Sequence, residues 1–261
     1  MFHDEMKLDA AAETERIASF VRKEIREAGR SRVVLGLSGG IDSALVAFLC
    51  VRAIGKENVL AFLLPYRTSS PQSSSDALAV SDLLGIKAET IDITPAVDAL
   101  KAALRPADPL RLGNLTARTR MIALYDRSAA HNAVVAGTGN RTESMLGYTT
   151  LHGDSACGFA PILHLYKCQV RQLAEYLDVP GHVIRKTPTA DLWQGQTDEA
   201  ELGFTYDEAD WLLFNMLDRR KSDAELEAMG FGRGFVARVK QLAAKSEFKR
   251  RMPHSLLEGQ R

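Results

Sequence analysis

The sequence has only three cysteines, Cys50, Cys157 and Cys168, and none belongs to a Cys-x-x-Cys pair. Their number and spacing argue against a disulfide framework and against a structural zinc site. No apolar run is as long as a membrane span, and the polar N-terminus lacks the apolar core of a signal peptide. These absences predict a protein of the reducing cytoplasm with no membrane partner.

An excess of charge of either sign is also missing, because 33 Lys and Arg residues balance 33 Asp and Glu residues. Without a bulk positive field, nucleic acid is not an expected partner. The one basic cluster, KSEFKRR at residues 245–251, is either a phosphate-binding patch or a solvated helix face. The ordinary balance of charged and apolar residues predicts a folded protein with a single domain over residues 1–261.

Short apolar runs alternate with helical patterns through the first half of the chain. The sequence predicts strands at residues 32–37, 59–64, 88–93 and 133–136. It predicts helices at residues 8–28, 44–54, 74–84, 94–104, 116–130, 166–177, 206–217, 224–229 and 235–244. Apolar strands separated by helices predict an α/β fold, a doubly wound parallel sheet flanked by helices. Two polar segments, residues 65–75 and 193–204, are either plain surface loops or lids over a site.

The sharpest signal is the string GLSGGIDS between a predicted strand and a predicted helix. Its members are Gly36, Leu37, Ser38, Gly39, Gly40, Ile41, Asp42 and Ser43. A helix N-terminus at the carboxyl end of a strand presents unpaired N–H groups to phosphate, and glycines allow a close approach. Because Asp42 repels phosphate unless a cation lies between them, the string predicts Mg²⁺ on Asp42.

Neither of the two common nucleotide motifs is present, since GxxxxGK[ST] and GxGxxG do not occur. The string resembles the SGGxDS loop of the ATP-pyrophosphatase (PP-loop) superfamily. That resemblance implies cleavage of ATP between its α and β phosphates, with AMP transferred to a substrate oxygen. The alternative is an ordinary glycine-rich turn in which Asp42 caps the helix.

Further blocks narrow the resemblance: ARTRM, GTGNRTESMLGY, HGD, LYKCQVRQLAEYLDVP, PTADLWQGQTDEAELGF and SEFKRRMP. In their order and spacing the chain is similar to the NAD synthetase family over nearly its whole length. The resemblance implies that Thr138 and Thr189 contact ATP, that Lys167 reaches its phosphates, and that Glu143 joins Asp42 on Mg²⁺. Taken singly, these residues are also compatible with turns, helix caps and solvated helix starts.

The resemblance also implies deamido-NAD and ammonia as substrates and a homodimer. Arg118 matches an arginine that contacts the dinucleotide from the partner subunit, and Lys249 matches a lysine that closes over the site. Three positions depart from the family pattern: Leu151 stands in place of a lysine, Gly158 in place of an aspartate, and Phe248 where a histidine is frequent. Either His152 and Asp154 supply substrate contacts in compensation, or the acyl substrate differs.

The resemblance implies amidation of deamido-NAD to NAD through an acyl-adenylate, with release of AMP and pyrophosphate. Only about 30 residues precede the first predicted strand, too few for an amidase domain, so free ammonia is the expected nitrogen donor. A separate glutaminase subunit stays open. The alternatives are another PP-loop ligase with a different carboxylate and a nucleotide-sensing module without turnover.

Overall fold

The computed structural model describes residues 3–189, 191 and 195–251, and it confirms the predicted α/β fold. The sheet holds strands β1 (Arg32–Gly36), β2 (Val59–Leu63), β3 (Lys87–Thr90) and β4 (Ala133–Val135). Their order is β3-β2-β1-β4 and every pairing is parallel. The chain builds outward from β1 through β2 to β3 and then returns to the other side of β1. This reversal places a topological switch point between β1 and β4, where ligands of open α/β sheets collect.

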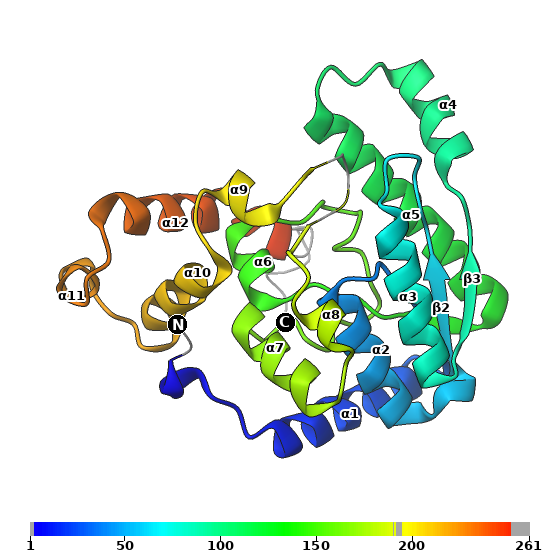
Figure 1. Cartoon of the computed structure of the whole chain (residues 1–261), viewed down its shortest axis with the longest axis horizontal. Helices are drawn as coiled ribbons and strands as arrows, with labels where there is room; N and C mark the ends of the chain where they lie inside the picture. The colour runs from blue at the N-terminus through cyan, green and yellow to red at the C-terminus, as the bar shows by residue number, and fades with distance from the viewer. Residues whose placement is uncertain (1–2, 190, 192–194, 252–261) are drawn as a thin grey trace, which may run out of the picture.

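Helices cover both faces of the sheet (Figure 1). On one face lie α2 (Ile41–Ile54) and α3 (Pro71–Leu84), with α1 (Ala10–Glu27) and α7 (Lys167–Tyr176) packed against α2. The other face is covered by α4 (Thr94–Leu104) and the long α5 (Pro109–His131). The two faces therefore have separate apolar cores, as a doubly wound sheet requires.

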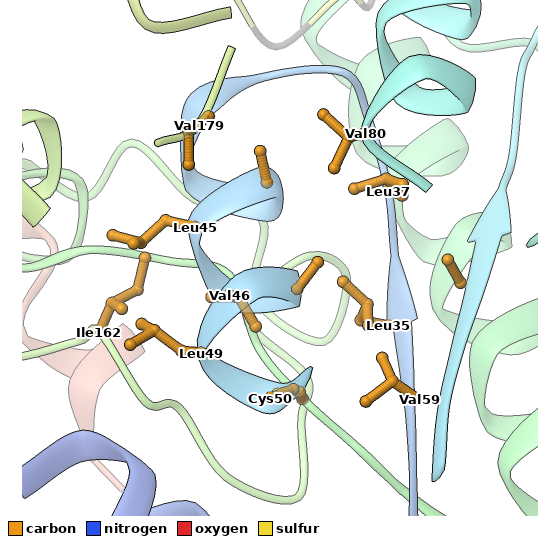
Figure 2. Close-up of a cluster of buried hydrophobic side chains, with 14 of the residues drawn as sticks. Leu35, Leu37, Leu45, Val46, Leu49, Cys50, Val59, Val80, Ile162 and Val179 are labelled. Atoms are coloured by element: carbon orange, nitrogen blue, oxygen red, sulfur yellow. The ribbon is translucent and has the colours of Figure 1, made fainter. Parts of the chain in front are cut away.

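Helix α2 is buried on two sides (Figure 2). Leu35 and Val59 of the sheet lie on one side of it, whereas Leu45 and Leu49 point toward Ile162 on the other. This double burial explains why the helix is apolar almost all round. It also fixes the N-terminus of α2 firmly at the carboxyl end of β1.

The remaining helices form a second group beside the sheet, with α10, α11 and α12 farthest from it (Figure 1). They are α6 (Arg141–Leu146), α9 (Asp198–Leu202), α10 (Tyr206–Leu213), α11 (Asp223–Ala228) and α12 (Arg233–Lys245), whereas the short α8 (Gly181–Ile184) packs on α2 and α7. Single turns of 3-10 helix occur at Asp4–Met6, Lys56–Asn58 and Glu247–Arg250, and α10 runs on into a π-helical turn, Phe214–Asp218. Most of this group shares a third core around Tyr166, Tyr206 and Leu212.

Several predicted boundaries were wrong, each for a local reason. Helix α3 begins at Pro71, inside the predicted loop at residues 65–75, because proline suits the first turn of a helix. Helix α5 begins at Pro109 instead of residue 116, after the N-cap Asp108, whose side chain accepts a hydrogen bond from Arg111 N. Strand β3 is mostly exposed and ends at Thr90, because it is an edge strand with Lys87 and Glu89 along it.

The short helices α6, α8 and α9 were not predicted, because four to six residues carry no readable period. Helix α9 lies inside the predicted loop at residues 193–204, and residues 192–194 of the neighbouring sequence are outside the described residues. In the described part of the chain, no helix combines the length and the apolarity needed to cross a membrane.

Candidate functional site

A cavity of about 460 Å³ opens at the carboxyl ends of the strands, beside the switch point. The segments after β1, β2 and β4 form its floor, and its sides are lined by α5, most of residues 147–156, residues 186–189, Asp191 and Lys249. The cavity therefore lies where the GLSGGIDS string predicted a ligand site.

The glycine loop between β1 and α2 has a backbone that only glycine suits. Gly39 has a φ of +76°, and a Cβ built on it lies 2.1 Å from Ser73 O. Gly40 is the N-cap of α2 and has no side chain to accept a hydrogen bond from it, so the first N–H groups of the helix have no side-chain cap. These are the conditions under which a helix N-terminus binds an anion.

The two serines of the string hold the loop in shape. Ser43 Oγ accepts a hydrogen bond from Ser38 N at 3.1 Å and donates one to Gly40 O at 3.0 Å. Ser38 Oγ accepts from Gly40 N at 3.3 Å. Leu37 and Ile41 also line the cavity, although both are buried in the core.

Three charged residues from different elements meet at the floor of the cavity. Lys167 Nζ, from the first residue of α7, contacts both Asp42 Oδ2 and Glu143 Oε1, the latter at 3.1 Å. Asn140 Nδ2 donates to Asp42 Oδ1 at 2.9 Å. The structure thus brings together the two predicted metal ligands and the predicted phosphate lysine.

Helix caps position this cluster. Asn140 caps α6 by accepting a hydrogen bond from Glu143 N at 3.0 Å, and Glu143 Oε2 accepts in return from Asn140 N. The alternative role predicted for Glu143, that of a carboxylate in the first turn of a helix, is therefore confirmed, and the same residue also lines the cavity. Thr142 Oγ1 accepts from Lys167 N at 3.0 Å and fixes the start of α7 beside α6.

Lys167 is only 2% exposed, so its charge is shielded from water and lies beside two carboxylates. Burial lowers the pKa of the Lys167 ammonium, but the carboxylates of Asp42 and Glu143 outweigh that effect and hold its pKa above the usual value. Burial raises the pKa of Glu143 to about 7, against the opposing influence of Lys167. The site accordingly favours a positive charge between the two carboxylates.

Of the five other residues predicted for the site, four line the cavity and one, Arg118, lies on the surface. Thr138, Thr189, Asp154 and Lys249 all line the cavity. Asp154 Oδ1 accepts from Thr150 N at 2.7 Å, and burial raises the pKa of this carboxyl. Lys249 Nζ donates to Gly147 O at 2.8 Å and to Thr149 O at 2.6 Å. Asp154 and Lys249 are therefore both held in place by backbone groups of residues 147–150.

Arg118 does not reach the cavity of its own chain. It is exposed, and its Nε donates to Leu151 O at 3.2 Å. Arg120, which was not predicted, lines the cavity instead and donates to Leu64 O at 3.1 Å and to Ser69 Oγ at 3.3 Å. Helical spacing explains the difference, because Arg120 lies one turn after the buried Thr116 and two residues from Arg118.

Lys186 is a second cation that sequence reasoning missed. Its Nζ donates to the buried Asp76 at 2.8 Å, to Ser73 Oγ at 3.2 Å and to Gly39 O at 3.3 Å. It therefore ties the glycine loop to α3. No local pattern marks Lys186, because its partners lie more than 100 positions away along the chain.

The departures from the family pattern have structural counterparts. A Cβ on Gly158 lies 2.4 Å from Val134 Cγ1, so the valine and the glycine fit each other. Leu151 is not among the cavity residues, nor is His152, whereas Asp154 is. Phe248 is 60% exposed. Of the two residues predicted to compensate, only Asp154 reaches the cavity.

An open parallel sheet with a glycine-lined loop at its switch point, and an aspartate in the first turn of the next helix, defines a nucleotide-binding α/β protein of the PP-loop class. The family model described as NAD synthase matches residues 13–253. The chain therefore belongs to the NAD synthase family.

Curated relatives agree over nearly the full length. The chain is 49% identical over 249 residues to an NH3-dependent NAD+ synthetase of Chlorobium phaeobacteroides, covering 95% of this chain and 90% of the relative. It is 48% identical over 237 residues to an NH3-dependent NAD+ synthetase of Fusobacterium nucleatum, covering 91% and 92%.

Two solved structures are also similar over almost their whole length. An NMN synthetase from Francisella tularensis has a TM-score of 0.84 at 34% identity, covering 95% of this chain and 99% of that one. An NH3-dependent NAD synthetase from Campylobacter jejuni has a TM-score of 0.82 at 36% identity, covering 96% and 100%.

Proposed function

We propose that this protein amidates the nicotinate carboxylate of deamido-NAD with ammonia, using ATP and releasing AMP and pyrophosphate. The observation that carries the proposal is the convergence of Asp42, Glu143 and Lys167 beneath the glycine loop. The names of the relatives, NH3-dependent NAD+ synthetases at about half identity, support the same substrates.

ATP is proposed to bind with its β and γ phosphates on the glycine loop and the N-terminus of α2. The uncapped N–H groups of α2 and the close approach permitted by Gly39 and Gly40 support this placement. Thr138 and Thr189 line the same cavity and are proposed to contact the nucleotide.

Asp42 and Glu143 are proposed to hold Mg²⁺. Their donor set fits this ion, because both present carboxylate oxygens to one point, where Lys167 Nζ lies, and carboxylates together with phosphates are the usual magnesium ligands. When bound, Mg²⁺ neutralises charge on phosphate oxygens. Lys167 is proposed to move its ammonium from the carboxylates to the phosphates that ATP brings.

The reaction has two steps. An oxygen of the nicotinate carboxylate attacks the α phosphorus of ATP, and the bond to pyrophosphate breaks as the loop amides and Lys167 stabilise the charge that leaves. Ammonia then attacks the acyl carbon, the bond to AMP breaks, and one proton is lost as the amide forms. Residues 65–75, together with residues 187–189 and Asp191, are proposed to keep water from the adenylate, and the hydrogen bonds from Ser70 N to the Asp191 carboxylate join these segments.

The acyl substrate is proposed to contact Asp154 and Lys249 of one subunit and Arg118 of a second copy in a homodimer. The position of Arg118 on the outer side of α5, away from the cavity of its own chain, supports a contribution in trans. Apolar side chains exposed on the same helix, Ile122 and Tyr125, support an interface there. The three free cysteines support a reducing compartment such as the cytoplasm.

A second acyl substrate is favoured by a specific observation. The Francisella relative is an NMN synthetase, and the acid that corresponds to that amide is nicotinate mononucleotide. Leu151 and Gly158 stand where the family pattern has a lysine and an aspartate, so two charges available for a larger dinucleotide are missing here.

One assay separates these readings. AMP and amide are measured with ATP, Mg²⁺ and ammonium, with deamido-NAD or nicotinate mononucleotide as the acid. We expect kcat/KM to be higher for deamido-NAD, and a higher value for the mononucleotide would assign the smaller substrate. Binding of ATP without AMP formation with either acid would instead favour a nucleotide-sensing module, and amidation of only another carboxylate a different ligase. Replacing ammonium by glutamine should abolish the product, because free ammonia is the proposed donor.

A further inference from the structure

Lys186 lines the cavity, but its hydrogen bonds go to the protein. Its Nζ donates to Gly39 O at 3.3 Å, to Ser73 Oγ at 3.2 Å and to Asp76 Oδ2 at 2.8 Å. An ammonium group has three N–H donors, so these three acceptors use all of them. In this arrangement Lys186 has no donor left for a phosphate, and its role has to be sought in what it holds.

Two of the three acceptors belong to one face of α3. Ser73 and Asp76 lie one turn apart at the start of this helix, and both are buried. Gln72 Nε2 donates to the other carboxylate oxygen of Asp76 at 2.7 Å. Burial raises the pKa of Asp76, but the hydrogen bonds from Lys186 and Gln72 outweigh that effect and hold the pKa below its usual value. Asp76 is therefore an ionised and immobile partner for the lysine.

The third acceptor belongs to the peptide unit that joins Gly39 to Gly40. This peptide bond is trans, so its carbonyl oxygen and its N–H point to opposite sides. Because its oxygen faces Lys186, its N–H faces Ser38 Oγ, which accepts from Gly40 N at 3.3 Å. Ser38 and Gly40 line the cavity, whereas Gly39 does not. The N–H of this peptide unit is therefore on the cavity side.

The loop residues alone do not fix this orientation. Glycine adopts positive and negative φ about equally readily, so a peptide unit between two glycines can rotate at little cost. After such a rotation the Gly39 carbonyl oxygen would lie on the cavity side, and its partial negative charge would repel a phosphate. Anion-binding loops need successive N–H groups directed at the anion. A hydrogen bond from a charged donor to Gly39 O keeps the peptide unit in the favourable orientation.

We propose that Lys186, held by Asp76, is a positioning residue that keeps the carbonyl oxygen of the Gly39–Gly40 peptide away from the bound phosphates. The inference rests on the proposed phosphate site and adds the side chains that maintain its binding conformation. This role differs from that of Lys167, whose ammonium is proposed to contact the phosphates themselves.

Lys186→Met removes the donor to Gly39 O and keeps the length of the side chain. The Kd of ATP with Mg²⁺, measured by calorimetry without acid or ammonium, should rise about 10-fold, because the binding orientation is then less populated. The Kd of pyrophosphate should rise by a similar factor. In the complete assay the KM for ATP should rise while kcat stays within about twofold, because the loop holds the phosphates both before and during the transfer.

Asp76→Asn separates a positioning residue from a direct phosphate ligand. Asparagine retains the oxygen that accepts from Gln72 and removes the charge that holds Lys186. If Lys186 positions the peptide, the Kd of ATP should rise about threefold or more, because the lysine is held less firmly at Gly39 O. A lysine that contacts phosphate would instead be released from a competing carboxylate. An equal or tighter Kd in this variant would overturn the proposal.

The double variant separates positioning from a purely structural ion pair. Lys186→Met alone leaves the buried Asp76 carboxylate without its lysine, so the urea midpoint should fall. Adding Asp76→Asn removes that charge, and the midpoint should recover. The Kd of ATP should stay as high as in Lys186→Met, because both changes act on the same peptide unit. Recovery of the Kd together with stability would overturn the proposal. If Lys186→Met does not fold, the double variant decides the question by the same titration.

Arg185→Met is the matched control, because Arg185 precedes Lys186, is exposed and is not among the cavity residues. Its Kd for ATP should equal the wild-type value. A wild-type Kd in Lys186→Met would overturn the positioning role whatever the acyl substrate is. Failure of the proposed function looks different: the wild-type protein would bind ATP in a manner that depends on Lys186 but would form no AMP with deamido-NAD and ammonium.

Discussion

Gly39 is the residue at which the backbone conformation and the proposed chemistry depend on each other most directly. Its positive φ and its contact with Ser73 leave no space for a side chain, and the loop it forms is the proposed pyrophosphate site. A change of one methyl group there is expected to act on fold and binding together.

Gly39→Ala should lower the free energy of unfolding by about 1–3 kcal/mol, because alanine is strained at this φ and its Cβ must displace the Ser73 carbonyl. The KM for ATP should rise about tenfold or more as the loop shifts. Urea denaturation and steady-state kinetics measure the two effects. The control is Gly234→Ala in α12, where no atom lies within 4 Å, and it should increase stability by about 0.5–1 kcal/mol.

Gly158 and Val134 form a coupled pair. Restoring the family aspartate with Gly158→Asp should destabilise the protein by about 1–3 kcal/mol, because its Cβ overlaps Val134 Cγ1. In the double variant with Val134→Ala, the loss should be smaller than the sum of the two single losses. Thermal unfolding of the four proteins completes the cycle, and additive losses would show that the valine is not the obstacle.

At the scale of elements, the site depends on how α6, α7 and α10 are held together. Asp210 of α10 accepts hydrogen bonds from Thr142 Oγ1 of α6 and, at 2.7 Å, from Cys168 N of α7. Thr142 in turn accepts from Lys167 N, so one buried carboxylate positions the helices that carry Glu143 and Lys167.

Asp210→Ala should cost about 2–5 kcal/mol of stability at pH 7, because it leaves two buried donors without an acceptor. Burial raises the pKa of Asp210 to about 6, above its unfolded value of about 3.9, so the native state binds the extra proton. The stabilisation from this carboxyl is therefore complete below the unfolded value and declines as pH rises through about 6. Urea titrations at pH 5 and pH 7 should show a larger loss at pH 5, and an equal loss at both would contradict the assignment.

For the whole molecule, the cavity is lined both by the carboxyl ends of the strands and by residues of α6, α7 and α9, so a ligand in it contacts the sheet and the helical group. ATP with Mg²⁺ at about 100 times its Kd should stabilise the native state by about 2.7 kcal/mol and raise Tm by roughly 5–10 °C. Asp42→Asn should fold normally, lose Mg²⁺-dependent turnover, and lose most of this shift. Scanning calorimetry with and without Mg²⁺ tests it, and full activity in the variant would refute Asp42 as a metal ligand.

Most of the architecture was predictable, because apolar runs and helical periods are local signals and the long elements carry them clearly. The glycine string and the carboxylate inside it also predicted the cavity at the switch point, which is the proposed phosphate site, since the requirement for glycine and for a cation is a property of adjacent residues. The bounds of the edge strand β3 were misplaced and the short helices α6, α8 and α9 were missed, because these features depend on neighbours and caps rather than on a period.

The sequence by itself determined the fold class, the family and the place of the cavity proposed to bind phosphate. Only the tertiary structure decided which side chains meet there. Asp42 contacts Asn140, which is 98 positions away along the chain, and Lys167, which is 125 positions away. It also directed Arg120 into the cavity and Arg118 out of it. The physical reason is that local patterns specify elements, whereas the packing of α2, α6, α7 and α9 around one cavity specifies contacts between residues far apart in sequence.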